Sequence, residues 1–284
     1  MTKGCLTFNQ FIRMALLPAC IGLLTAGCQT YKNKNTIITE WRQGNITNAV
    51  AIATKKADKN ANNKDAIIWR LEQAATLRAD GKWAASNQAF DQAQDKIDDY
   101  AQKAKVRLAQ ETGALLSNQD NLDYEGRSYD GIMLNTYKAL NYLALGDAEK
   151  ARPELIRAYQ RQQDAVEDNK KRIEKVQKEA EESKDKKAIE KAENDSKFQM
   201  QMSNAQVDIQ EVKGYADYVN PFTVYLDGLY FLANSTGTSD LERARKSFER
   251  VVGFDPDNRY VKEDLATADA VLGGKTLSPT TYVI

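Results

Sequence analysis

The chain has 284 residues, with 40 basic and 40 acidic side chains and no histidine. A formal net charge of zero gives no electrostatic basis for nucleic-acid binding, and the lack of histidine removes the commonest general base and metal ligand. Charged residues make up 28% of the chain and the mean hydropathy is −0.61, which indicates a soluble, largely helical body. We expect an all-α protein with no cofactor, no metal and no bound nucleic acid.

The first 27 residues have the features of an export signal. The segment carries two basic residues, Lys3 and Arg13, and no acidic residue, and it continues into a short apolar run at residues 14–27. The apolar run is too short to span a membrane stably, but its length suits the core of a secretory signal. The three cysteines lie in or directly after this segment, at Cys5, Cys20 and Cys28. We therefore predict that residues 1–27 are a signal peptide.

Residues 24–28 read Leu-Thr-Ala-Gly-Cys and resemble the lipobox of bacterial lipoproteins, although Thr25 replaces the more usual aliphatic residue. The resemblance implies cleavage before Cys28 and attachment of acyl chains, such as palmitate, to Cys28. Several acyl chains anchor a protein firmly, because each buried methylene contributes roughly 0.8 kcal/mol. Gln29 stands where an aspartate would favour retention in the inner membrane. The resemblance thus implies an outer-membrane protein facing the periplasm of a Gram-negative host; the alternative is an ordinary signal peptide with an incidental cysteine.

Residues 28–36 are polar and predict a lipidated tether, and residues 37–160 predict tetratricopeptide-like helical repeats. The repeat pattern is a small residue, a bulky residue, a glycine turn and a small residue again. Small residues let two helices approach closely, and bulky ones fill the groove between them. The pattern recurs in three places, at Gly44 and Ala49, at Gly81 and Phe90, and at Ala139, Tyr142, Gly146 and Ala151.

The glycine spacing predicts one additional unit. Gly44 and Gly81 are 37 residues apart, close to the roughly 34 residues of this repeat class. Gly81 and Gly146 are 65 residues apart, so we expect a degenerate repeat between them. Pro153 falls inside the helix after Gly146, where it removes a hydrogen bond and is expected to kink the helix or delay its start.

Tyrosines cluster before and within the central repeat. Four of them are candidates for a partner-binding groove, because a tyrosine ring adds contact area and its hydroxyl adds a hydrogen bond. The alternative is that these rings fill the repeat core and the loop corners. The four residues are Tyr124, Tyr129, Tyr137 and Tyr142.

Residues 161–213 change character and predict a charged helical hairpin arm. Acidic residues precede basic ones by four positions, as at Glu167 and Lys171, and such pairs stabilise a helix by roughly 0.2–0.5 kcal/mol each. We expect a long exposed helix, a turn near residues 183–187 and a returning helix. A disordered charged linker is the competing interpretation.

Residues 214–273 predict the last repeat and a capping helix. Asn220 and Pro221 open the repeat, and its small, bulky and terminating positions are Gly228, Ala244, Phe248 and Pro256. A helix from Tyr260 to Leu272 is expected to cover the end of the stack. Residues 274–284 are predicted to be a non-helical tail. Residues 273–276 resemble the end of a phosphate-binding loop, but Asp269 occupies the place of the earlier glycine and a helix precedes them.

The sequence of residues 124–155, with the lipobox before it and residues 221–232 after it, resembles a family of poorly characterised bacterial TPR-type lipoproteins. That resemblance implies an envelope scaffold with no established reaction. We expect the repeats to hold an envelope protein partner, in the regulation of cell-wall synthesis or in envelope assembly or secretion. Two alternatives remain open: a peptidoglycan-acting enzyme using Glu125 and Asp130, or a carrier of lipid or another small ligand. The oligomeric state is not indicated.

Overall fold

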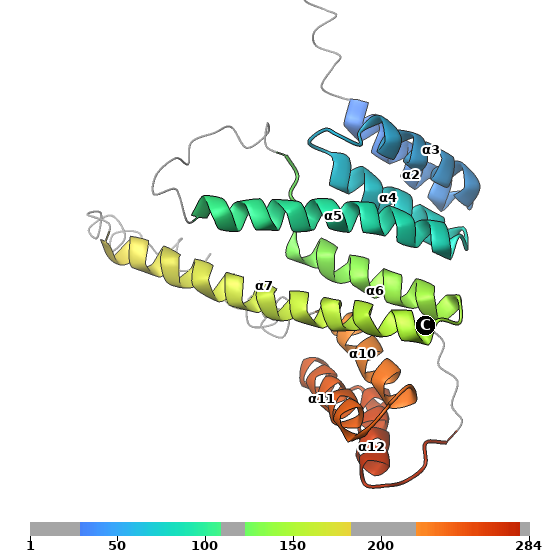
Figure 1. Ribbon diagram of the computed structural model, residues 1–284, viewed down its shortest axis with the longest axis vertical. Helices are drawn as coiled ribbons and strands as arrows, with labels where there is room; N and C mark the ends of the chain where they lie inside the picture. The colour runs from blue at the N-terminus through green and yellow to red at the C-terminus, as the bar shows by residue number, and fades with distance from the viewer. Residues whose placement is uncertain (1–28, 109–122, 183–219, 279–284) are drawn as a thin grey trace, which may run out of the picture.

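The computed structural model describes residues 29–108, 123–182 and 220–278 of the chain. These residues form nine α-helices and no strand, which confirms the all-α prediction. Each helix packs on the next one along the chain, and the helices follow one another from the N-terminal to the C-terminal end of an elongated molecule (Figure 1). The helices are α2 (Gln29–Arg42), α3 (Ile46–Lys59), α4 (Ala66–Ala79), α5 (Trp83–Leu108), α6 (Ser128–Ala144), α7 (Ala148–Glu182), α10 (Pro221–Ala233), α11 (Thr238–Phe254) and α12 (Arg259–Leu272).

Three of the connections are tight glycine turns, as the sequence predicts. Gly44, Gly81 and Gly146 have φ angles of 78°, 72° and 76°, in the left-handed region that favours glycine. In each turn the amide of the residue after glycine bonds to the carbonyl five positions back, for example Asp147 N to Tyr142 O at 2.9 Å. The glycine amide bonds to the carbonyl three positions back. This pair of bonds is the Schellman motif, which satisfies carbonyls at a helix C-terminus and reverses the chain.

The interfaces between the helices combine small and bulky buried residues. Ala49, Ala139, Ala151 and Ala244 are fully buried, and so are the rings of Phe90 and Phe248. Gly228 of α10 lies directly against Phe248 of α11, because a Cβ added at Gly228 would stand 2.8 Å from Phe248 Cε1. The close approach of these two helices therefore depends on the absence of a side chain at residue 228. Pro256 lies in the exposed turn that follows α11.

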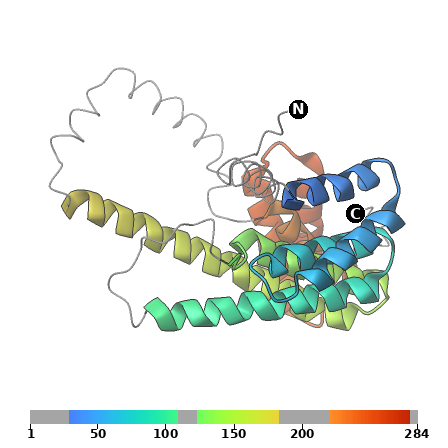
Figure 2. The same ribbon diagram turned by 90° about the horizontal axis from the view of Figure 1, so that it is seen from above.

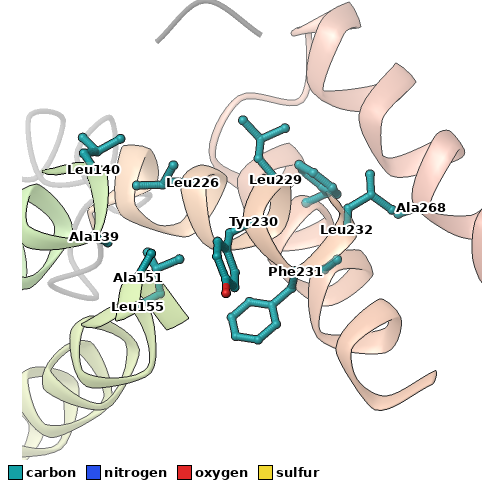
Figure 3. Packing of buried hydrophobic residues seen from close by; sticks show 12 residues of the cluster. Ala139, Leu140, Ala151, Leu155, Leu226, Leu229, Tyr230, Phe231, Leu232 and Ala268 are labelled. Atoms are coloured by element: carbon teal, nitrogen blue, oxygen red, sulfur yellow. The ribbon is translucent and has the colours of Figure 1, made fainter. Parts of the chain in front are cut away.

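A large apolar cluster joins α6 and α7 to the C-terminal helices. In Figure 3, Leu226 of α10 lies beside Leu140 and Ala139 of α6. Ala151 and Leu155 of α7 belong to the same cluster. At the far end, α12 packs on α11 and contributes Ala268 to this cluster, in keeping with the expected capping helix. Asn258 caps α12, since its Oδ1 accepts from the amides of Tyr260 and Val261.

Two sequence-based expectations differ from the structure, and one of the two effects expected of Pro153 is excluded. Residues 29–36, predicted to be a tether, belong to α2, and no glycine or proline interrupts them. In the described part of the chain no extra repeat separates α5 from α6: α5 is 26 residues long and packs directly on α6, and residues 109–122 of the predicted unit lie outside the described residues. Pro153 does not delay α7, which begins at Ala148.

α5 and α7 project beyond the shorter helices on the same side of the molecule (Figure 2). α7 has 35 residues, which corresponds to about 52 Å at 1.5 Å per residue. Its later turns cover residues 161–182 of the predicted arm, where Lys171 and Glu167 form an ion pair at 2.6 Å. The predicted turn and returning helix of the arm lie outside the described residues, as do Cys28 and the last residues of the tail.

Candidate functional site

A groove runs between the facing sides of α4 and α6, with α5 behind it. α5 packs on both helices and therefore holds them apart, and its Phe90 ring contributes to the floor. The groove has a volume of about 490 Å³. α4 lines it with residues at spacings of three and four, and so does α6, as expected for one face of each helix. These residues are Ile68, Leu71, Glu72 and Ala75 of α4 and Tyr129, Asp130, Met133, Leu134 and Tyr137 of α6.

We call this site, with its lining residues Tyr124, Tyr129 and Tyr137, the tyrosine groove. The loop before α6 closes one end of it, and Tyr124 fixes that loop in place. The Tyr124 amide donates to Lys64 O at 2.8 Å, and the Tyr124 hydroxyl hydrogen bonds to the Asp130 carboxylate. Burial, and then the Asp130 carboxylate, raise the pKa of Tyr124 well above its usual value. The hydroxyl therefore stays protonated and acts as a donor across the physiological range.

Gly126 makes the loop possible. Its φ angle is 84°, and a Cβ added there would stand 2.9 Å from Cγ1 of Ile97 on α5. The loop backbone thus lies against α5. Asp130 holds the start of α6, because its Oδ2 accepts from the Arg127 amide at 2.9 Å. The structure gives Asp130 two partners in the protein, the Tyr124 hydroxyl and the Arg127 amide, which is a structural role at the beginning of the helix.

Tyr137 is both a wall of the groove and part of the core. Its ring stacks on Phe90 with centroids 6.1 Å apart, and the Arg78 guanidinium lies 5.4 Å from the Tyr137 centroid. Arg78 is held in turn by Asn141, whose Oδ1 accepts from Arg78 Nη1 at 2.6 Å. Tyr137 therefore has a fixed position, whereas Tyr129 at the rim is 55% exposed and available for contact.

The structure brings three of the four predicted tyrosines together. Tyr124, Tyr129 and Tyr137 line the groove. Tyr142 packs instead against the apolar cluster shared with α10, and the Lys150 ammonium lies 5.9 Å from its ring centroid. The α4 wall was not identified from the sequence, because its contact with the tyrosines arises only from the packing of both helices on α5.

A polar network around the buried Lys138 of α6 was also missed. Lys138 of α6 is 2% exposed, and its Nζ lies 2.6 Å from Asp91 Oδ1 of α5 and 2.9 Å from Glu154 Oε1 of α7. Asn135 donates to Glu154 Oε2 at 2.6 Å and accepts from Arg161 Nε at 2.9 Å. The network links α5, α6 and α7, so it sets the orientation of the helix that carries the groove tyrosines. A lysine on the apolar face of α6 was the only sequence signal.

The tyrosine groove offers aromatic and aliphatic contact area with a polar rim. Leu71 and Met133 supply apolar surface on opposite walls, while Glu72, Arg127 and Asp130 place charges along the edges. Such a lining suits an apolar side chain of a bound segment, whose backbone can hydrogen bond to the rim. The α4 wall spans residues 68–75, which is about 10 Å of helix. That length accommodates three or so residues of extended peptide or two turns of a helix.

Comparisons with known proteins give no match: no family model, no curated protein and no solved structure is similar to this chain. Among the helices that the structure describes, none is long and apolar enough to cross a membrane. The described ranges likewise contain no cluster of carboxylate and cysteine side chains arranged to hold a metal ion.

Proposed function

We propose that the protein is a lipid-anchored scaffold of the outer membrane whose tetratricopeptide-like helices hold a segment of an envelope protein in the tyrosine groove. The tyrosine groove is the observation that carries this proposal. It lies between the first helices of two successive hairpins, α4 with α5 and α6 with α7. In helical-repeat proteins the extended concave surface is the usual binding face.

The repeat interpretation is supported by local geometry. Three hairpins are joined by the same glycine turn, and the small residues Ala49, Ala139 and Ala151 and the bulky Phe90 are buried, while Tyr142 is partly buried. The groove also has the composition of a protein-binding centre, because tyrosine and methionine are enriched at interface cores. A partner engaged in cell-wall synthesis or in envelope assembly would fit the location that the lipobox implies.

The groove is tested by photo-crosslinking in cells. A photoreactive phenylalanine analogue replaces Tyr129 at the groove rim or Tyr260 on α12, two tyrosines that are 55% and 62% exposed. We expect a discrete adduct from position 129 and none from position 260, and mass spectrometry of the adduct identifies the partner. Identical products from both positions, or none from position 129, would contradict the proposal.

A second substitution shows whether the groove itself is needed. Ala75→Lys places a long side chain in the groove, whereas Ala79→Lys adds the same side chain at an exposed position of the same helix. The adduct from position 129 should disappear in the first variant and persist in the second.

The anchor is tested separately. Cys28→Ser should abolish labelling by a fatty-acid analogue and leave the precursor uncleaved, since the thiol is the acceptor in the lipobox interpretation. Continued labelling of the serine variant would refute the lipobox interpretation and would leave the proposal for the tyrosine groove unaffected.

A further inference from the structure

A second groove lies between α7 and α11, away from the residues of the tyrosine groove. One face of α11 lines it, with Tyr159 of α7 and Val224 of α10 completing the walls. Its volume is about 360 Å³. The α11 face carries charged residues at helical spacing: Glu242, Arg243, Lys246 and Arg250. We call this the α11 groove.

Arg243 is part of the framework of the α11 groove rather than a free cation. Its Nη2 lies 2.7 Å from Asp227 Oδ1 and its Nε 3.1 Å from Asp227 Oδ2, and Asp227 is 2% exposed. The guanidinium also lies 4.1 Å from the ring centroid of Phe231 and 5.0 Å from that of Tyr159. Asp227 matches the charge of Arg243, and the two rings fix its plane.

Lys246 and Arg250 have no such partner among the described residues. The other arginines of α11 are paired: Arg243 with Asp227, and Arg245 with Asp269 and Glu249 at 2.8 and 3.2 Å. Among the residues that the structure describes, Glu242 is the only acid lining the α11 groove. The groove therefore carries a positive surplus on a chain whose formal net charge is zero.

The spacing of Lys246 and Arg250 along α11 indicates the spacing of the anionic groups that could pair with them. Lys246 and Arg250 are four positions apart on a helix, which separates them by about 6 Å along the axis. Side chains two positions apart in an extended peptide face the same side at about 6.6–6.8 Å. Two carboxylates in an acid-x-acid arrangement thus match the two cations. Tyr159, near Arg243, leaves an exposed aromatic face for an apolar residue further along the same side of the peptide.

We propose that the α11 groove binds an extended acidic segment of a protein partner, with Asp or Glu at two positions separated by one residue. This site is independent of the tyrosine groove, and its failure would leave the function proposed above unaffected. An extended peptide also suits its length, because the lining residues 239–250 cover about 16 Å of helix, or roughly five residues of strand.

The test measures fluorescence anisotropy of labelled peptides added to the purified full chain. The probe is a fluorescein-labelled Leu-Ser-Glu-Ser-Glu peptide, and its controls are the glutamine counterpart and Leu-Ser-Ser-Glu-Glu. We expect binding of the probe that weakens as sodium chloride is raised, and weaker binding of both controls. Equal binding of the glutamine peptide, or no binding of the probe, overturns the proposal; equal binding of the contiguous acids overturns the proposed spacing.

Charge variants locate the binding. The double variant Lys246→Gln, Arg250→Gln should lower the affinity for the probe roughly tenfold, as expected for the loss of two partly exposed ion pairs. Glu242→Gln should strengthen it, because Glu242 stands four positions before Lys246 and competes for its charge. The matched control, Lys55→Gln with Lys59→Gln, removes the same charge from exposed positions of α3 and should leave binding unchanged.

Unchanged binding in the Lys246/Arg250 variant would overturn the proposal. A second binding measurement uses vesicles of anionic phosphatidylglycerol in place of the peptide, to distinguish a lipid headgroup from an acidic peptide. If they bind the α11 groove residues while the peptide does not, the ligand is a lipid headgroup and the peptide proposal is wrong.

Discussion

Gly228→Ala tests whether the C-terminal helices pack through the absence of a side chain. The added Cβ would meet Phe248 Cε1 at 2.8 Å and two other ring atoms at 3.0 Å. Real Cβ contacts are rarely this close, so α10 or the buried Phe248 ring must shift. Overpacking of this kind costs about 1–3 kcal/mol, whereas replacing a helical glycine by alanine recovers about 0.5–1 kcal/mol. We expect a net loss of roughly 1 kcal/mol in the free energy of unfolding.

Gly253→Ala is the matched control. Gly253 also lies in a helix, α11, but a Cβ there meets no atom within 4 Å. The same substitution should therefore stabilise the protein by about 0.5–1 kcal/mol. The difference between the two variants isolates the steric cost, and each kcal/mol corresponds to a shift of roughly 2–4 °C in Tm for a domain of this size.

A double-mutant cycle with Phe248→Leu assigns the cost to the ring. Leucine lacks the Cε1 and Cζ atoms that the new Cβ would meet, so Phe248→Leu should be less harmful in the Gly228→Ala protein than in the wild type. We expect a coupling of about 1 kcal/mol in urea unfolding followed by circular dichroism. Equal effects of alanine at residues 228 and 253, or an additive cycle, would refute the proposed close approach.

Three further predictions address other parts of the molecule. Gly146→Val should lower Tm by destabilising the turn by at least about 1–2 kcal/mol, because valine must adopt the φ of 76°; an unchanged Tm would contradict this. Glu154→Gln should cost about 2–3 kcal/mol in urea unfolding, less than the 3–5 kcal/mol of a broken isolated pair because Asp91 still pairs with Lys138. Arg152 lowers the pKa of Asp240, so this carboxylate stabilises the fold fully above the unfolded pKa of about 4 and progressively less as pH falls through the lower folded pKa. The stability gap between wild type and Asp240→Asn should therefore narrow in acid titrations below about pH 4, and a gap independent of pH would contradict the ion pair.

Local features were the ones that the sequence predicted well. The turns at Gly44, Gly81 and Gly146 were correctly placed because a left-handed residue at a helix end is encoded by the glycine itself. The start of the first helix was placed too late because the polar residues 29–36 were taken for a tether, whereas they form the first turns of α2; a polar composition does not by itself exclude a helix. The expected extra repeat does not separate α5 from α6 in the described part of the chain, because α5 continues as one helix over residues 83–108 and packs on α6, and the rest of the expected unit, residues 109–122, lies outside the described residues.

Features that depend on contacts between distant segments were found only in part. Three of the four tyrosines, Tyr124, Tyr129 and Tyr137, line one groove because they lie within one short stretch that includes a single face of α6. The opposite wall on α4 and the partners of Lys138 come from residues 16 to 69 positions away, which no periodicity connects. The α11 groove requires contact between Tyr159 and Arg243, which the charged segment separates in the sequence, and composition alone does not indicate that contact.

The central claim is that the tyrosine groove holds a partner segment, and hydrogen exchange tests it most directly. The protein identified by crosslinking is purified and added to the purified chain, and amide exchange is compared with and without it. The account predicts added protection in α4 and in residues 123–137, with little change in α3 at the N-terminal end of the stack. Protection that leaves both walls of the groove unchanged would contradict it.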